Sequence, residues 1–201
     1  MSKEAHDVQG SCTFYLGFNN AKAPFDNQKV RQAFAQAFDR DAYVRDVLQN
    51  LGKPTQSFIP PGFPGYEASD QWGFDPAKAK ATLAEAGFPD GKGLPEIKLT
   101  FGSSARNKVR FEWIANQIKQ NLGIDVVLDP VDPTAYTALT KDPETTPQTF
   151  FLGWCADFPD PQNWLTAVFK TGGSASARIT FSNEEFDKLV TAADNESDTA
   201  K

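Results

Sequence analysis

The sequence predicts an α/β fold in which a largely parallel sheet is flanked by helices, with residues 1–201 forming a single domain. Residues 97–101 alternate between apolar and polar side chains, which is typical of a half-buried strand. A helical pattern covers about residues 106–122, and residues 124–128 return to a strand pattern. A strand, a helix and a second strand in this order form a right-handed β-α-β unit, so a parallel sheet is expected.

The N-terminal part of the chain is predicted to contribute one strand and two helices. Residues 13–18 are aromatic and β-prone, as strands are. Apolar residues between positions 30 and 38 recur three and four positions apart behind Asp26, which predicts a helix capped by this aspartate. A second helix is expected over about residues 41–51, with Gly52 as its C-terminal stop.

Proline and glycine mark the boundaries in the middle of the chain. Residues 54–73 combine these two residue types with several aromatic side chains, so we expect a packed loop without regular structure. Asp75 and Pro76 are typical of a helix start, and Gly87 is typical of a helix end.

The last third of the chain is expected to extend the same architecture. A short helix over about residues 134–139 and a strand over about 149–152 enlarge the α/β unit, and a final helix covers residues 183–193. The glycine- and serine-rich residues 172–176 are predicted to form a mobile surface loop.

Composition limits the classes of function. The chain has 201 residues, 40% of them hydrophobic, which is enough to bury a core. The net charge of -6 argues against nucleic acid or an anionic membrane as partner, because phosphate binding needs clustered Lys and Arg, and it favours a neutral or cationic small ligand. With one histidine, His6, neither a zinc site nor a Ser-His-Asp triad is expected.

Targeting segments are not evident in the sequence. Residues 1–7 are too polar for a signal peptide, and no apolar run approaches the roughly 18 residues that a membrane span needs. We therefore expect this chain to be soluble and to carry no targeting signal of its own.

Two segments follow predicted strands at the same edge of the sheet, where parallel α/β sheets bind ligands. One segment supplies Trp154 and Asp157, and the other supplies Ser104 and Arg106. A carboxylate from one segment and a guanidinium from the other are suited to holding a zwitterion such as a peptide by its two ends.

Simpler explanations exist for each of these residues. Asp157 and Asp160 are typical of turns, and Asp160 also fits a helix cap, which leaves Asp157 as the better ligand candidate. Trp154 alone is typical of a core, and Arg106 or Arg110 of an exposed helix surface. A carbohydrate hydrolase would use the two aspartates as a pair, but three-residue spacing at a turn seldom holds carboxyl groups about 5 to 9.5 Å apart across a substrate.

The two cysteines, Cys12 and Cys155, allow two interpretations on spacing alone. They form either a disulfide, which implies an oxidising compartment, or two buried reduced thiols that act as small apolar side chains. A bond between them would close a loop of more than half the chain, and chain entropy assigns such a loop about 4 to 5 kcal/mol.

Several blocks of sequence occur in a recognisable order. They are Leu16-Gly17-Phe18-Asn19-Asn20, Pro24-Phe25-Asp26-Asn27-Gln28-Lys29-Val30-Arg31-Gln32-Ala33 with Asp39-Arg40, Phe74-Asp75-Pro76-Ala77-Lys78-Ala79-Lys80, Leu83-Ala84-Glu85-Ala86-Gly87, Gly123-Ile124-Asp125-Val126 and Trp154-Cys155-Ala156-Asp157-Phe158-Pro159-Asp160-Pro161. Over nearly its whole length the chain thereby resembles the peptide/nickel class of bacterial extracellular solute-binding proteins, the receptors of ABC importers for oligopeptides and dipeptides.

This resemblance implies a type II-like periplasmic-binding-protein lobe and assigns roles to the best-matched motif. In the oligopeptide-binding branch, the Trp-Cys-Ala-Asp segment lies in the ligand cleft. By this resemblance, Asp157 pairs with the α-amino group of a peptide, Trp154 and Cys155 lie beside it, and Cys155 is bonded to Cys12. In dipeptide-binding relatives an arginine near the start of the long helix meets the ligand carboxylate, which points to Arg106.

Ser104 and Asn19 complete the expected set of ligand-binding residues. The implied function is that of the substrate-binding component of an ABC transporter, which captures peptides for import without chemistry on them. No cofactor is expected, the partner is an ABC permease, and the full protein is expected to be an exported monomer, either periplasmic or held at the cell surface as a lipoprotein. The alternative is a receptor of the same family for a nickel chelate, an opine, haem or an oligosaccharide.

Members of this family are much longer than 201 residues. They carry a signal sequence and a first lobe that forms the other wall of the cleft, and they continue beyond the region that matches Lys188. Residues 1–201 are therefore expected to correspond to the second, ligand-binding lobe of a two-lobe receptor.

Overall fold

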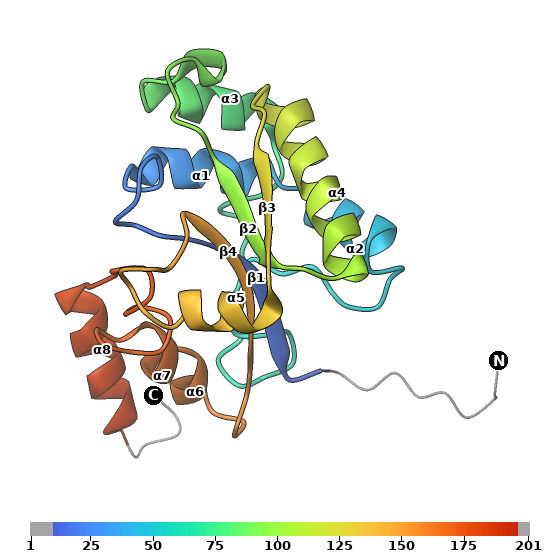
Figure 1. Ribbon diagram of the computed structural model, residues 1–201. Coiled ribbons are helices and arrows are strands. Elements are labelled where there is room, and N and C mark those ends of the chain that lie inside the picture. Colours follow the sequence, from blue (N-terminus) through green and yellow to red (C-terminus); the bar gives the residue numbers. More distant parts are fainter. Residues whose placement is uncertain (1–9, 197–201) are drawn as a thin grey trace, which may run out of the picture.

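The structure, a computed structural model, describes residues 10–196, so His6 and residues 1–7 lie outside the described residues. The elements are β1 Cys12–Phe18, α1 Gln28–Gln36, α2 Arg40–Asp46, α3 Pro76–Glu85, the short 3-10 helix η1 Pro89–Gly91, β2 Lys98–Gly102, α4 Ala105–Leu122, β3 Val127–Val131, α5 Pro133–Leu139, β4 Thr149–Cys155, α6 Pro161–Trp164, α7 Thr166–Phe169 and α8 Glu184–Asp194. Within the described residues, β1 is followed by helices α1 to α3, strands and helices then alternate from β2 to β4, and helices α6 to α8 come last (Figure 1).

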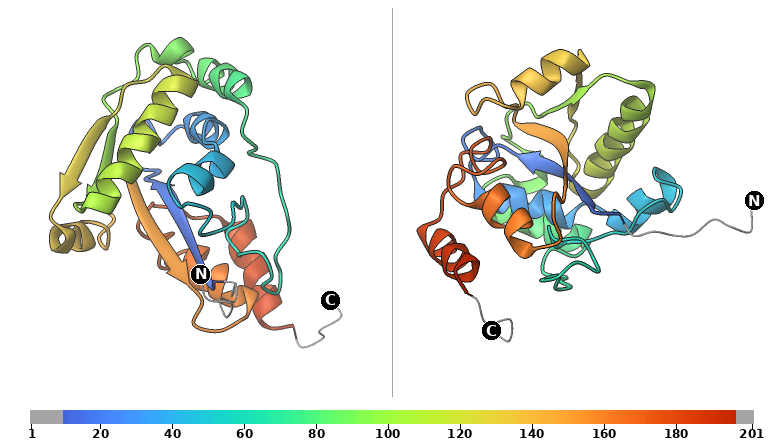
Figure 2. Two further views of the ribbon diagram at one scale, coloured as in Figure 1. Left: turned by 90° about the vertical axis from the view of Figure 1, so that its right-hand side faces the viewer. Right: turned by 90° about the horizontal axis from the view of Figure 1, so that it is seen from below.

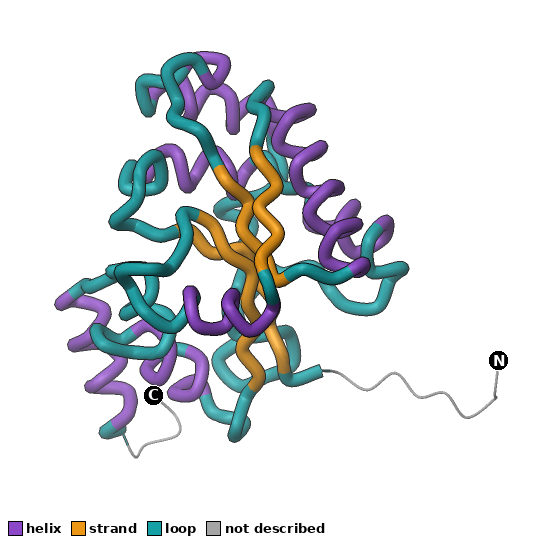
Figure 3. The backbone as a smooth tube through the Cα atoms, viewed as in Figure 1, coloured by secondary structure: helices purple, strands orange, loops and turns teal. Residues whose placement is uncertain are grey.

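The four strands of residues 10–196 form one sheet in the order β1-β4-β2-β3. Figure 3 shows that this sheet is twisted. β2 pairs in parallel with both β3 and β4, which confirms the expected α/β class and the β-α-β unit around α4. β1 is an edge strand and runs antiparallel to β4 along its whole length. The sheet is thus parallel at its centre and antiparallel at one edge.

Helices cover both faces of this sheet. Seen from below, α4 and α5 lie on opposite sides of the strands (Figure 2). On the α4 side, Phe101 of β2 stacks on Phe111 of α4 with ring centroids 4.1 Å apart. On the other side, a Cβ atom at Gly102 would lie 3.5 Å from the Tyr136 ring, so α5 packs against this face of β2. The main core is on the α4 side and includes Phe25, Val30, Phe34, Leu83, Leu99, Phe101, Phe111, Ile114, Ile118 and Leu122.

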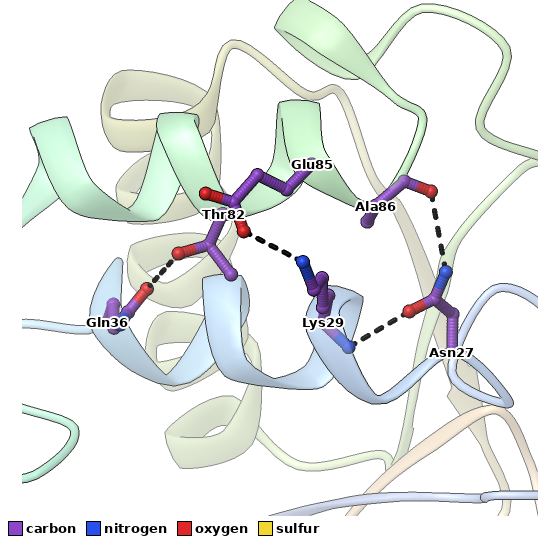
Figure 4. Close-up of polar contacts among 6 residues, drawn as sticks. All are labelled: Asn27, Lys29, Gln36, Thr82, Glu85 and Ala86. Carbon is purple, nitrogen blue, oxygen red and sulfur yellow. Dashed lines mark hydrogen bonds and ion pairs between the residues drawn. The ribbon is translucent and has the colours of Figure 1, made fainter.

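α1 and α3 pack side by side and are joined by one exposed and one partly buried polar contact (Figure 4). The Lys29 ammonium lies 2.8 Å from the Glu85 carboxylate, and the Thr82 hydroxyl donates to the Gln36 side-chain oxygen at 3.0 Å. Gln36 is almost fully buried, so its bond to Thr82 satisfies a polar group that water does not reach.

Two helix boundaries differ from the prediction. α1 begins at Gln28, and its cap is Asn27 rather than Asp26, because the Asn27 side chain accepts the hydrogen bond from the Lys29 amide. α2 ends at Asp46 instead of continuing to residue 51. The cause is local: Gln49 and Asn50 both have positive φ angles, which a right-handed helix does not allow.

The other expected helix ends are confirmed. Asp75 caps α3 through a bond from the Lys78 amide, with Pro76 as the first helical residue. Gly123 ends α4 in the left-handed conformation, at a φ of 77°.

The loop between α2 and α3 contains neither helix nor strand and packs closely, as predicted. The Phe58 ring contacts the rings of Tyr15, Trp164 and Phe169, and the backbone carbonyl of Phe58 accepts a bond from the Thr13 hydroxyl at 2.9 Å. This loop therefore joins the edge strand β1 to α6 and α7.

Residues 172–176 do not form a surface loop, which corrects the prediction. Ala175 is 3% exposed and Ser176 is fully buried. The Ser176 hydroxyl donates to the Lys170 carbonyl at 2.6 Å, and the amides of both residues donate to the Val168 carbonyl. Small side chains allow this segment to fold back onto α7, where the composition alone indicated a mobile loop.

Tyr136 of α5 supplies a hydrogen-bonding partner where β4 separates from β2. The register between these strands is limited to Leu99 opposite Thr149. Two residues further along β4, the Tyr136 hydroxyl donates to the Phe151 carbonyl at 2.9 Å and accepts from the Phe151 amide at 2.7 Å. Burial raises the pKa of Tyr136 to about 12, while the bond from the Phe151 amide lowers it.

This pKa predicts a loss of stability at alkaline pH. Free tyrosine has a pKa of about 10, so the unfolded chain ionises first and the contribution of Tyr136 falls as the pH rises from about 10 to about 12. We expect the difference in unfolding free energy between the wild type and Tyr136→Phe to shrink by about 1 to 1.5 kcal/mol between about pH 9 and about pH 11. Urea unfolding of both proteins at each pH measures this difference. A difference that stays constant between the two pH values would contradict a raised pKa of Tyr136.

Candidate functional site

The disulfide between Cys12 and Cys155 fastens the C-terminal end of β4 to the start of β1. The two cysteines are direct partners in the antiparallel register, with Cα atoms 4.0 Å apart, and their sulfur atoms are bonded. Just beyond the bond, the Ala156 amide donates to the Ser11 carbonyl at 2.8 Å. The predicted disulfide is confirmed, and it fixes the strand end from which the candidate site begins.

Trp154 and Asp157 lie on either side of this strand end and share one partner. The Trp154 indole N–H donates to the side-chain oxygen of Asn163 at 3.0 Å, and the Asp157 backbone amide donates to the same oxygen at 3.3 Å. Asn163 is only 2% exposed and belongs to α6, which lies beside the lower end of β4 in Figure 1. The structure thus brings these two predicted residues together.

The two aspartates of this segment have different environments. Asp160 caps α6, and its carboxylate accepts the Gln162 amide at 2.8 Å, as the sequence predicted. The side chain of Asp157 is exposed and makes no hydrogen bond or ion pair with any residue in 10–196. Asp157 therefore presents an uncompensated carboxylate on a backbone that is held in place.

Ser104 and Arg106 lie at the same edge of the sheet but are not in contact with Asp157. Ser104 caps α4 by accepting the Asn107 amide at 3.1 Å, and the Arg106 side chain is exposed. β2 ends three residues after Leu99, whereas β4 continues six residues past Thr149, its partner. At about 3.3 Å per residue, the end of β4 projects about 10 Å further than the end of β2.

Asn19 lies at the other end of the sheet and has a structural role. Because β1 runs antiparallel to β4, its C-terminal end is remote from Asp157. Asn19 is fully buried, its amide donates to the Thr146 carbonyl, and its side-chain oxygen accepts the Ala21 amide. The predicted ligand contact of Asn19 is corrected, because no part of this side chain reaches the surface.

Arg110 is not the solvated helix charge that the sequence left open. Its guanidinium carbon lies 4.3 Å from the centre of the Phe151 ring, and it donates to the Asn107 side-chain oxygen at 3.1 Å. A guanidinium over an aromatic face is attracted by the ring's electron density. Arg110 therefore links α4 to β4.

A large apolar groove of about 1070 Å³ opens on the α4 side of β1. Its walls come from β1, α2, the following loop and the middle of α4, and include Phe14, Tyr15, Phe38, Leu51 and Ile118. Neither Trp154 nor Asp157 lines it, but Cys12, the disulfide partner of Cys155, does. The groove therefore reaches the strand end from which the candidate site begins.

A model of the family described as "Bacterial extracellular solute-binding proteins, family 5 Middle" matches residues 1–176. The chain belongs to this family. The resemblance found in the sequence motifs is thereby confirmed.

Two curated relatives cover nearly the whole of this chain. The chain is 35% identical over 198 residues to heme-binding protein A of Haemophilus influenzae and 32% identical over 194 residues to the dipeptide-binding protein DppE of Bacillus subtilis. These alignments cover 93% and 92% of this chain but 34% and 35% of the relatives. The chain thus spans about a third of the length of these curated relatives.

A solved structure agrees on the fold. The periplasmic oligopeptide-binding protein OppAIV of Borrelia burgdorferi superposes with a TM-score of 0.84 at 31% identity, covering 93% of this chain and 37% of that one. The expected type II-like lobe is confirmed.

The family is described as extracellular solute-binding proteins, and each of these relatives is named as a binding protein, the one from Borrelia burgdorferi as a periplasmic one. Within residues 10–196, no helix is long and apolar enough to cross a membrane. In the same residues, no cluster of three or more His, Cys, Asp or Glu side chains is placed to hold a metal ion.

Sequence reasoning did not identify Asn163. It follows Asp160 in a short helical turn, and nothing in its local pattern distinguishes it from any other polar helix residue. Its importance depends on Trp154 and Asp157, which reach it only in the folded chain.

Proposed function

We propose that this chain is part of the substrate-binding component of an ABC transporter that captures peptides for import. The observation that carries the proposal is the exposed carboxylate of Asp157, which has no partner in residues 10–196 although its backbone is fixed. Such a group is suited to a charge-assisted hydrogen bond with the α-amino group of a peptide. The printed names of DppE and OppAIV, a dipeptide-binding and an oligopeptide-binding protein, support this ligand class.

Main-chain recognition explains how such a receptor accepts many peptides. Pairing with the α-amino group and the peptide backbone does not depend on the side chains of the ligand, which water-filled pockets then accommodate. Arg106 and Ser104 remain candidates for contacts with the rest of the ligand. The offset between the ends of β2 and β4 places them well away from Asp157, so a ligand that reaches both is longer than a single amino acid.

The length of this chain relative to that of its relatives supports a two-lobe arrangement of the full polypeptide. Because this chain spans about a third of its relatives, we infer that it corresponds to one ligand-binding lobe and that a first lobe completes the cleft. The full polypeptide is then an exported monomer, periplasmic or lipid-anchored, that delivers peptide to an ABC permease. Closure of two lobes around the ligand is the usual motion of such receptors.

The proposal predicts a specific effect of Asp157→Asn. In the full-length polypeptide that contains this chain, the variant is expected to weaken binding of a peptide with a free amino terminus by about 1.5 to 3 kcal/mol, because the negative charge that strengthens the hydrogen bond to the amine is lost. This corresponds to about 10- to 150-fold in dissociation constant. Isothermal titration calorimetry with one peptide, in its free and its N-acetylated form, measures the effect.

Asp160→Asn is the matched control. Asparagine caps helices as well as aspartate does, so this variant removes a nearby negative charge and preserves α6. We expect it to leave affinity unchanged. An Asp157→Asn variant that binds the free-amine peptide as tightly as the wild type would refute the role of Asp157.

Haem is the second candidate ligand, because the chain is 35% identical to heme-binding protein A. Titration of the same polypeptide with haem, followed by its visible absorbance, separates the two. Saturable binding of haem together with no binding of peptides would replace the peptide proposal.

A further inference from the structure

Asn163 is a buried side chain that accepts two hydrogen bonds from the segment that carries Asp157. The segment leaves β4 at Cys155, turns through residues 156–160 and enters α6. One side-chain oxygen, that of Asn163, accepts from the Trp154 indole at the start of this turn and from the Asp157 amide within it. The turn is thus tied internally at two points to the same atom.

Burial makes these two bonds important. Asn163 is 2% exposed, so water does not replace a lost partner there. Asp160 caps α6 and Pro161 is its first residue, so the helix that carries Asn163 begins directly after the turn. Within the described residues, the bond to Asn163 is the one that holds the Asp157 amide.

We propose that Asn163 is a positioning residue for ligand binding, which fixes the backbone of Asp157 so that its carboxylate is aimed at the ligand's amine before the ligand arrives. This inference rests on the proposed function. Asn163 does not itself need to touch the ligand, because a carboxylate on a fixed backbone loses less conformational freedom on binding than one on a mobile turn. Trp154 takes part by donating its indole N–H to the same oxygen.

A pair of nearly isosteric variants tests this role in the full-length polypeptide. Asn163→Leu keeps the volume and removes the acceptor, whereas Asn163→Asp keeps an acceptor oxygen. We expect Asn163→Leu to weaken binding of the free-amine peptide by about 5- to 20-fold and Asn163→Asp to remain within about 3-fold of the wild type. Binding of the N-acetylated peptide, which lacks the charged amine, should change by less than about 2-fold in both variants.

A double-mutant cycle separates positioning from general damage. If Asn163 acts through Asp157, then Asn163→Leu added to Asp157→Asn lowers affinity by less than about 2-fold further. Losses that multiply, or an equal loss for free and N-acetylated peptide, would overturn the positioning role. Asn183→Leu is the control, since Asn183 caps another helix, α8, through the Phe186 amide and should alter stability without altering affinity.

Hydrogen exchange tests the geometry without any variant. On isotope-labelled wild-type protein, the Asp157 amide should exchange at least about 10-fold more slowly than the neighbouring Phe158 amide, for which the structure records no hydrogen bond. Equal, fast exchange would overturn the inference even if Asn163→Leu did not fold. The peptide proposal fails separately, by an unchanged affinity in Asp157→Asn.

Discussion

Replacing both Cys12 and Cys155 with serine is expected to lower the free energy of unfolding by about 4 to 5 kcal/mol. The disulfide joins residues 143 positions apart, so its loss restores a large conformational freedom to the unfolded chain. The folded chain loses less, because the seven-residue ladder between β1 and β4 and the bond from Ala156 to Ser11 remain. Equilibrium unfolding in guanidinium chloride measures the change.

The oxidised and reduced wild type provide the matched comparison. Treatment with a thiol reductant should bring the wild type to the stability of the double serine variant and should leave that variant unaffected. A difference below about 1 kcal/mol between the oxidised protein and the variant would show that the unfolded chain is already compact around this loop.

The same bond is expected to matter less for binding than for stability. Cys155 precedes Asp157 by two residues, but Asp157 is held by Asn163 rather than by the disulfide. Peptide affinity of the reduced full-length polypeptide, measured where it is still folded, should therefore stay within about 3-fold of that of the oxidised form. The comparison thus distinguishes the role of the disulfide, which fastens the end of β4 to β1, from that of Asn163, which holds the Asp157 backbone.

Local chemistry determined the parts of the fold that the sequence predicts well. Gly123 ends α4 because a left-handed residue is easiest for glycine, and Asp75 with Pro76 begins α3 because both suit the first turn of a helix. The assignment of Asp160 to a cap has the same origin. Each of these features depends on neighbours within a few residues, so the sequence carries it directly.

Features that depend on distant partners were predicted poorly or not at all. Neither the position nor the direction of β1 in the sheet is encoded in residues 12–18, because its partner lies more than 130 residues away. Asn19 belongs to a motif shared with ligand-binding proteins, yet its side-chain amide donates to the Thr146 carbonyl and stabilises the end of the sheet opposite Asp157. Asn163 and Tyr136 are ordinary polar helix residues until the fold brings β4 to them.

The candidate site combines residues that the sequence identifies with a contact that only the folded chain creates. The resemblance to peptide receptors assigned Asp157 to the ligand and Cys155 to the disulfide, and the structure adds that the Asp157 side chain has no partner among the described residues. The partner that holds its backbone comes from six residues further along the chain, after a turn. No periodic pattern marks such a contact, because it depends on the angle at which α6 leaves β4.

Replacing Phe111 with alanine is expected to lower the free energy of unfolding by about 3 to 5 kcal/mol, the usual range for a large aromatic side chain in a core. The Phe111 ring is fully buried, stacks on Phe101 of β2 and meets the edge of Phe151 of β4. It therefore fills the space where α4 crosses two neighbouring strands, and alanine would leave a cavity there that the stiff sheet cannot close.

Val109→Ala on the same helix is the matched control. Val109 is 61% exposed, and its replacement by a better helix former should change the unfolding free energy by no more than about 0.5 kcal/mol. Thermal or urea unfolding of both variants, with the disulfide intact, tests the expectation. A loss below about 1.5 kcal/mol in Phe111→Ala would mean that α4 can move toward the sheet and fill the cavity. The distance between α4 and β4, which the contact of Arg110 with the Phe151 ring spans, would then be adjustable rather than fixed.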